Sequence, residues 1–421
     1  MTVSRFLAVI FINIAFLKKL MEPWVSEKWW VSPFNFADEV QKSFKKPSEV
    51  IFHDVTLRDG EQTPGVVFRK NEKIEIAKML DEIGIQRIEA GMPLVSEEDA
   101  EAIKSIAHEN LKAKVFGFAR LLKEDIDAVL KCDASGIICE GPVGTPKLKQ
   151  YGWAKEEIFS RAISAIDYAK AHGLYTVFFG VDTSRAEAGL LIQLLKRLEV
   201  ETKVDGFAIV DTYGCCSPEG FGYLVRMINK EVKKTLEVHC HNDMGLGVAC
   251  TISGILNGAQ VAHTSINGIG ERSGNASFEE TALCLKLLYG IPLNIKFEKL
   301  YELSKLVEKY SCFPLSPNKP IVGDRVFTRE AGIGVAAWLK YRLGSEAFLP
   351  ELVGNKEGVV LGKKSGKHSV EWKLKQMNLQ ATEDEVINIL NLVKKLGEEK
   401  KRALTDEEFL EIYSKVKASK S

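Results

Sequence analysis

The feature that most constrains the fold is a regular alternation, from Ser48 onward, of short β-rich apolar runs with amphipathic stretches of helical length. Strands that alternate with helices indicate a parallel sheet with helical crossovers. Eight such units predict a (β/α)8 TIM barrel, and a doubly wound open sheet is the alternative. Strand patterns cover residues 50–56, 87–91, 114–119, 136–139, 175–181, 206–211, 236–241 and 260–266. Helical patterns cover residues 70–83, 96–109, 123–131, 155–172, 185–200, 218–233, 245–257 and 279–288.

Polar residues gather directly after these predicted strands. Arg58 and Asp59 follow the first strand, Thr212 follows the sixth, and residues 267–275 follow the eighth. In a barrel of this kind the active site lies at the carboxyl ends of the strands. The pattern therefore places these side chains around one site.

The segment around His239 and His241 predicts a metal site. Residues two apart on a strand point to the same face, so both imidazoles project together while Cys240 points away. Two imidazoles with a carboxylate suit zinc, and further oxygen ligands permit manganese or magnesium. Asp59 is the expected third ligand, and Arg58 beside it supplies a fixed cationic donor. The alternative for Asp59 and Arg58 is a simple ion pair in a turn.

Composition excludes some classes of function. Lys+Arg and Asp+Glu both number 57, and this balance argues against a nucleic-acid-binding protein. The eight cysteines show no disulfide or zinc-ligand spacing, which predicts free thiols and a cytoplasmic location.

The apolar run at 6–16 is too short to span a membrane. We expect residues 1–20 to precede a true start at Met21 or to form a loosely attached helix.

The alternation stops after residue 295, which predicts a division into four parts. Residues 1–47 form an N-terminal extension, 48–295 the barrel, 296–370 a lid or linker subdomain, and 371–421 a helical tail. The tail is rich in Lys and Glu, so we expect it to be solvated or packed on a partner subunit.

Four segments resemble the isopropylmalate, homocitrate and citramalate synthase family, a group of TIM-barrel metalloenzymes. They are His53–Gly65 (HDVTLRDGEQTPG), His239–Ala249 (HCHNDMGLGVA), Asn267–Asn275 (NGIGERSGN) and the linker motif Leu361–Gly366. The resemblance runs from about residue 50 to 370. It implies a divalent-metal enzyme, active as a homodimer, that joins an acyl-CoA to a 2-oxo acid.

The resemblance also assigns roles to single residues. Asp59, His239 and His241 match the metal ligands, and Asn275 matches a residue at or near the metal. Arg58 matches the arginine that polarises the ketone, Thr212 the threonine that holds the carboxylate, and Gln62 a position close to the substrate. For Thr212 and Asn275 the alternative is a helix N-cap, and for Gln62 a solvated turn position.

Three active-site segments depart from the family pattern. The lid segment is Arg329-Glu330-Ala331-Gly332-Ile333-Gly334, which lacks the family's histidines. The fifth strand ends in Val181-Asp182 where the family carries a Glu-Asp pair, and residues 141–149 lack a histidine. We expect the acid–base role to pass to Glu330, with His53 or a water molecule as alternatives.

Three functions are compatible with these motifs. The first is condensation of acetyl-CoA with a 2-oxo acid. The second is carbon–carbon bond cleavage of the hydroxymethylglutaryl-CoA lyase type, but those lyases carry a cysteine in the eighth-strand loop and this chain has none there. The third is a metal-binding paralogue with altered catalysis. No membrane and no nucleic-acid partner is expected.

Overall fold

The computed structural model describes residues 22–419, and these form two compact units. The larger unit covers residues 33–315 and contains the barrel. The smaller unit combines the described residues up to Ser32 with the chain from Ser316 onward. The apolar run at 6–16 and the start proposed at Met21 lie outside the described residues. The division into four parts at 47, 295 and 370 stays a prediction.

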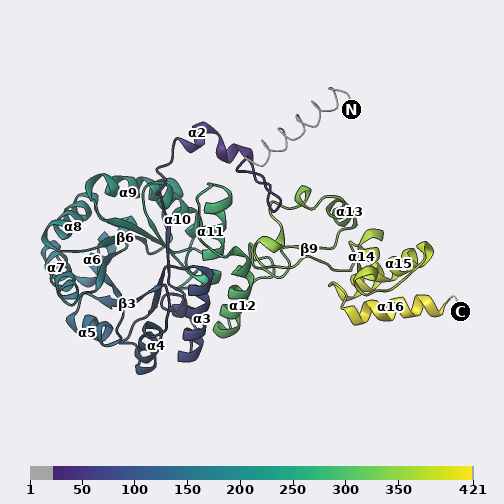
Figure 1. Cartoon of the computed structure of the whole chain (residues 1–421), viewed down its shortest axis with the longest axis horizontal. Helices are drawn as coiled ribbons and strands as arrows, with labels where there is room; N and C mark the ends of the chain where they lie inside the picture. The colour runs from purple at the N-terminus through teal and green to yellow at the C-terminus, as the bar shows by residue number, and fades with distance from the viewer. Residues whose placement is uncertain (1–21, 420–421) are drawn as a thin grey trace, which may run out of the picture. The chain divides into compact units, whose positions relative to one another are not determined.

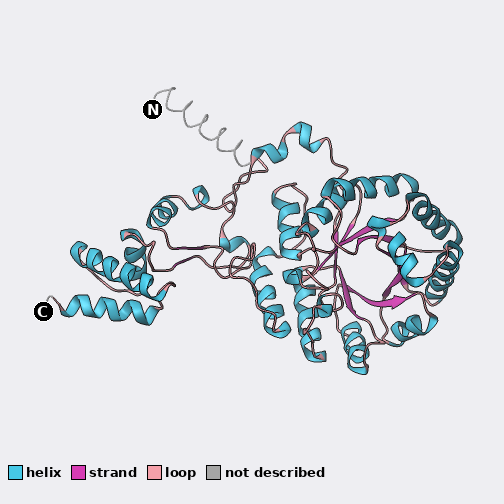
Figure 2. Cartoon of the chain, turned by 180° about the vertical axis from the view of Figure 1, so that it is seen from behind, coloured by secondary structure: helices cyan, strands magenta, loops and turns pink. Residues whose placement is uncertain are grey.

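Eight parallel strands close into a barrel in chain order, with the last strand paired to the first. Helices surround the strands, as Figures 1 and 2 show. This confirms the predicted TIM barrel and excludes the open sheet. The strands are β1 (Ile51–Asp54), β2 (Arg87–Gly91), β3 (Lys114–Arg120), β4 (Gly136–Pro142), β5 (Tyr175–Val181), β6 (Gly206–Asp211), β7 (Thr235–Cys240) and β8 (Val261–Thr264).

The eight helices predicted for the barrel are found with small shifts at their ends. The strand predicted to carry the histidine pair is shifted by one residue: β7 contains His239 and ends at Cys240, and His241 forms an isolated bridge with Asn275. The helices of the barrel unit are α2 (Asp38–Gln41), α3 (Lys70–Ile83), α4 (Glu97–Ala107), α5 (Lys123–Lys131), α6 (Thr145–Tyr151), α7 (Lys155–Ala171), α8 (Ala188–Glu201), α9 (Pro218–Glu231), α10 (Gly247–Leu256), α11 (Phe278–Leu287) and α12 (Leu300–Ser311). Of these, α2 and α6 were not predicted.

The interior of the barrel is apolar on one side and polar on the other. The apolar cluster comes from β3 to β6 and consists of Phe116, Phe118, Ile138, Val177, Phe179, Ala208 and Val210. On the polar side, β1, β2, β7 and β8 contribute buried charged residues. Arg87 Nη1 donates to Glu237 Oε1 at 2.7 Å, and His263 Nε2 lies 2.8 Å from Glu237 Oε2. A buried charge is tolerated only with such partners.

The smaller unit has its own apolar core. Its elements are β9 (Thr328–Arg329), α13 (Gly332–Lys340), β10 (Gly358–Val359), α14 (Lys367–Gln376), α15 (Glu383–Lys400) and α16 (Asp406–Ala418). Ten buried side chains between Leu361 and Val416 pack together there. The tail was expected to be solvated or held by a partner subunit, but its apolar faces pack within the chain. No helix within residues 22–419 is long and apolar enough to cross a membrane.

We predict that Arg87→Met lowers the free energy of unfolding by about 3–5 kcal/mol, because Glu237 then stays buried without its cation. Denaturant titration measures the change. Lys196→Met is the control, because Lys196 pairs with Glu231 on the outer surface and such exposed pairs contribute about 1 kcal/mol or less. Equal losses in the two variants would contradict a structural role for the buried pair.

Candidate active site

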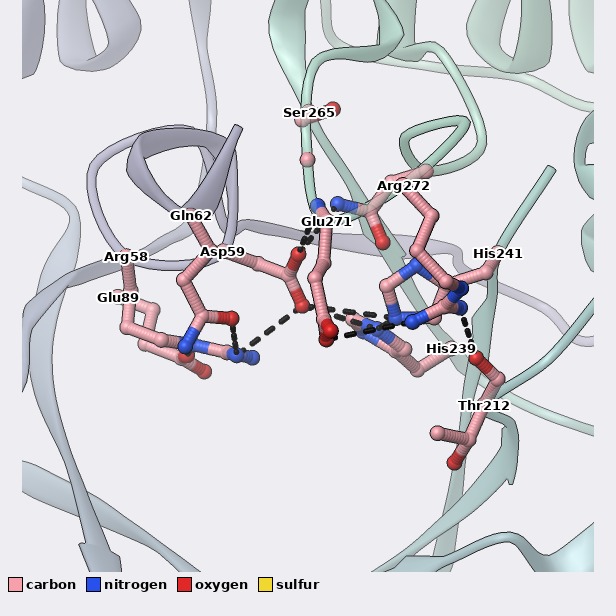
Figure 3. Close-up of polar contacts among 12 residues, drawn as sticks. Arg58, Asp59, Gln62, Glu89, Thr212, His239, His241, Ser265, Glu271 and Arg272 are labelled. Carbon is pink, nitrogen blue, oxygen red and sulfur yellow. Dashed lines mark hydrogen bonds and ion pairs between the residues drawn. The ribbon is translucent and has the colours of Figure 1, made fainter. Parts of the chain in front are cut away.

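Asp59, His239 and His241 converge at the carboxyl end of the barrel (Figure 3). The Nε2 atoms of the two histidines lie 3.3 Å apart, and Asp59 Oδ2 lies 3.5 Å from His239 Nε2 and 3.7 Å from His241 Nε2. All three side chains are buried. The sequence motifs, which lie about 180 residues apart in the chain, therefore meet in one place, as the metal-site hypothesis requires.

The donor set fits a divalent cation. Zinc binds imidazole nitrogen at about 2.0–2.1 Å, so two such ligands in tetrahedral geometry lie roughly 3.4 Å apart. Burial lowers the pKa of His239 to about 3, which keeps this imidazole neutral and free to bind a metal. Burial alone would raise the pKa of Asp59, but Arg58 and the two imidazoles hold it well below its usual range. The cluster thus offers two neutral nitrogens and one carboxylate oxygen.

Asn275 lies against this cluster. Its Nδ2 donates to Asp59 Oδ1 and to the Ile269 carbonyl, both at 3.1 Å. Its Oδ1 is buried and has no hydrogen-bond partner in the described part of the chain. The N-cap alternative is wrong, because the N-cap of α11 is Ser277. Asn275 orients Asp59 and leaves one amide oxygen unused.

Arg58 is buried and held on three sides. Its Nε donates to Glu89 Oε1, and its Nη1 donates to Asp59 Oδ2 at 3.0 Å and to Gln62 Oε1 at 3.4 Å. The guanidinium carbon lies 4.1 Å from the centre of the Phe118 ring. Nη2 is buried without a partner among residues 22–419. Arg58 is therefore more than a turn ion pair, since one fixed donor stays available beside the cluster.

Thr212 lies on the other side of the cluster from Arg58 (Figure 3). Its Oγ1 accepts a hydrogen bond from the Asp182 backbone N–H at 2.7 Å. The N-cap of the next helix, α9, is Ser217, so Thr212 does not cap it. Because Oγ1 already accepts, its own hydrogen is left for an acceptor such as a carboxylate.

Glu330 belongs to the smaller unit, and its carboxylate has partners there. Glu330 Oε1 accepts the Lys364 backbone N–H at 3.0 Å, and Lys364 Nζ lies 3.3 Å from Oε2. Within the larger unit, the structure gathers the other predicted site residues around one point: Arg58, Asp59, Gln62, Thr212, His239, His241 and Asn275.

The departures from the family pattern have visible structural counterparts. Asp182 holds Arg185 through two hydrogen bonds of 2.7 and 2.9 Å. A Cβ atom on Gly144, in the loop before α6, would collide with the Asp182 carboxylate. The space beside Gly144 is thus filled by this ion pair. Val181 and Phe179, on the inner side of β5, are apolar.

Sequence reasoning missed Glu89. It is fully buried at the centre of β2 and contacts both Arg58 and His53, whose Nε2 lies 2.9 Å from Glu89 Oε2. Burial would raise the pKa of Glu89, but Arg58 and His53 lower it to about 2. An acidic residue inside an apolar strand was the available signal. His53, considered as an alternative base, is fully buried and engaged with Glu89.

The barrel, its buried HxH pair and the carboxylate from the first strand define a metal-site TIM-barrel enzyme. Residues 49–307 match the HMGL-like family, and residues 321–401 match the homocitrate synthase post-HMGL domain-like family. The chain belongs to this HMGL-like family, in the branch with the homocitrate, isopropylmalate and citramalate synthases. The predicted resemblance and the predicted enzyme class are confirmed.

Three relatives illustrate the match. The homocitrate synthase AksA of Methanothermobacter thermautotrophicus is 41% identical over 93% of this chain and 98% of its own length. The 2-isopropylmalate synthase of Methanocaldococcus jannaschii is 42% identical, covering 85% and 70% of the two chains. The (R)-citramalate synthase CimA of the same organism is 41% identical, covering 82% and 70%.

Among solved structures, the HMG-CoA lyase of Bacillus subtilis superposes with a TM-score of 0.58 at 20% identity, over 64% of this chain and 96% of the lyase. At this identity the likeness shows the shared fold alone.

We predict that acid destabilises the metal-free protein partly through His53. Burial and the neighbouring His263 lower the pKa of His53 from 6.5 to about 4. The unfolded chain therefore binds a proton below pH 6.5 that the folded protein does not bind until about pH 4. The free energy of unfolding falls as pH drops between these values, by roughly 1.4 kcal/mol per pH unit from this group.

Denaturant titrations at several pH values measure this slope. His53→Gln keeps a donor for Glu89 but cannot titrate, so its slope should be shallower than that of the wild type. His172→Gln, on the exposed end of α7, is the control and should leave the slope unchanged. Equal slopes for His53→Gln and the wild type would contradict the assignment.

Proposed function

We propose that this protein condenses an acyl-CoA, acetyl-CoA in the first instance, with a 2-oxo acid, and releases CoA by thioester hydrolysis. The product is a 2-hydroxy dicarboxylate or tricarboxylate. The observation that carries the proposal is the buried group of Asp59, His239 and His241, called here the metal-type cluster. Beside it lies Arg58, which has one donor nitrogen, Nη2, without a partner in the described part of the chain. The three relatives described above are synthases of this kind, which favours condensation over cleavage.

The position of each residue in the site determines its role in the reaction. A divalent ion held by Asp59, His239 and His241, with Asn275 beside it, would supply Lewis acidity toward the ketone of a 2-oxo acid. Arg58 directs its free Nη2 to the oxygen on which negative charge develops, and such fixed donors often provide the largest catalytic term. Gln62 steadies Arg58 from one side.

Thr212 and Arg58 fix the orientation of the oxo acid. The hydroxyl of Thr212 donates to the carboxylate, on the side of the cluster away from Arg58. The carboxylate and ketone of a 2-oxo acid are adjacent, so one molecule reaches both residues across the cluster. The carbonyl carbon then presents one face to the acyl-CoA.

The identity of the metal, the cellular compartment and the oligomeric state belong to the same proposal. Two imidazoles and a carboxylate favour zinc, while the Asn275 oxygen and the substrate oxygens suit manganese or magnesium. All eight cysteines are free thiols, which suits a reducing, cytoplasmic compartment. We further propose a homodimer, with Trp30 (41% exposed) and Phe34 (80% exposed) as candidates for the interface. A role for Glu330 as a base stays a prediction.

We expect purified protein with Zn²⁺, Mn²⁺ or Mg²⁺, acetyl-CoA and a panel of 2-oxo acids to release free thiol with at least one oxo acid. Asp59→Ala removes the carboxylate ligand, so its bound metal and its thiol release should both fall to background. Asp167→Ala, an exposed carboxylate on α7, is the matched control. Cleavage of a hydroxyacyl-CoA without thiol release from any oxo acid would instead support a lyase, and metal binding without either reaction a catalytically altered paralogue.

We predict that Arg58→Lys folds and binds metal but loses about 100- to 1,000-fold in kcat, the usual effect of removing one oxyanion donor. A lysine ammonium cannot contact Glu89, Asp59 and the substrate in one plane, as the guanidinium does. Steady-state kinetics and metal analysis measure the two effects. Arg197→Lys, on the outer helix α8, serves as the control. Near-full activity in Arg58→Lys would refute the assigned role.

A further inference from the structure

Glu140 differs from the other buried or half-buried carboxylates at the carboxyl end of the barrel. It is half-buried near the end of β4, yet within residues 22–419 no hydrogen bond or ion pair engages its side chain. The others on the strands and their following loops are each held by a cation or by backbone N–H groups: Asp54, Asp59, Glu61, Glu89, Asp99, Asp125, Asp182 and Asp211. A half-buried carboxylate without donors costs stability, which suggests a role other than structure.

The backbone directs Glu140 into the barrel. Ile138, two residues earlier on β4, belongs to the apolar interior cluster, and side chains two apart share a face. The Cα of Glu140 is in register with Phe179 on β5. The Phe179 ring lies 5.1 Å, centre to centre, from the His239 imidazole. Glu140 therefore stands one strand away from a residue that touches the metal-type cluster.

The surroundings of Glu140 favour proton acceptance. Burial raises the pKa of Glu140, and the charges of Arg58, Lys147 and Arg120 offset this only in part. Arg120 is already committed to Asp125 through hydrogen bonds of 2.8 and 3.0 Å. A carboxylate with raised proton affinity and no fixed donor is the type of group that serves as a general base.

The neighbouring strand β5 carries no inward side chain that could accept the proton in place of Glu140. The inward residues of β5 are Val177, Phe179 and Val181, none of which can take up a proton. Their apolar side chains also limit water beside Glu140. An acyl-CoA methyl group that approaches the oxo acid from the β4–β5 side would therefore meet Glu140 as the first basic atom.

We propose that Glu140 is the general base that removes a methyl proton from the acyl-CoA, a role that rests on the proposed condensation. The Glu140 carboxylate takes the proton, and the electron pair of the broken C–H bond forms the enolate of the thioester. The enolate carbon then bonds to the ketone carbon of the 2-oxo acid, and the π electrons of the ketone move to its oxygen, where Arg58 donates. Glu140 returns the proton to solvent or product before the next turnover.

The test compares Glu140→Gln, Glu140→Asp and the control Glu124→Gln, an exposed glutamate on α5, in the metal-loaded full chain. We expect Glu140→Gln to lower kcat for thiol release by about 100- to 10,000-fold. Metal content and the calorimetric Kd for the 2-oxo acid should match the wild type. With deuterated acetyl-CoA the isotope effect on kcat should rise, because proton removal becomes rate-limiting. Glu140→Asp should recover part of the activity, and Glu124→Gln should behave as wild type.

The outcomes separate the two proposals. If the wild type releases no thiol with any oxo acid, the condensation fails and the role of Glu140 with it. If the wild type is active and Glu140→Gln stays within a few-fold of it, the base assignment alone is overturned. A raised Kd for the oxo acid with an unchanged isotope effect would also overturn it, because Glu140 would then bind substrate. If Glu140→Gln does not fold, the isotope effect in Glu140→Asp decides in the same way.

Discussion

The buried ion pair between Arg58 and Glu89 is the interaction on which the site depends. Glu89 accepts from Arg58 on one oxygen and contacts His53 with the other, so both side chains are fixed. Arg58 in turn holds Asp59 toward the imidazoles. Charges in a low-dielectric interior interact strongly but are costly to bury, so each of these buried charges needs its partner. This explains why the polar half of the barrel is built from paired residues.

The two halves of the barrel interior have different tasks. The polar half, from β7 through β8 to β2, carries the cluster and the charges that orient it. The other half, from β3 to β6, supplies apolar packing, and Glu140 on β4 is its exception. Arg58 joins the halves, since its guanidinium is ion-paired on one side and stacked on Phe118 on another. A charged group placed between fixed partners and an aromatic ring has little freedom to move.

Much of the fold was predictable because the pattern of alternation is strong, and β2, β5 and β6 begin and end where the sequence indicates. The metal-type cluster was predictable for the same reason: its residues lie at strand ends, and strand ends meet. Glu89 and Glu140 were not predicted, because their roles depend on which strand lies beside which side chain. The tail was misjudged because its charged residues hid an apolar face that packs within the chain.

The close approach of Gly144 to Asp182 limits which residues position 144 can accept. Asp182 is clamped by Arg185 and donates its backbone N–H to Thr212, so it cannot move aside without disturbing the site. Any larger residue at position 144 would meet that carboxylate first. A side chain at position 144 therefore fits only if Asp182 or Arg185 changes as well.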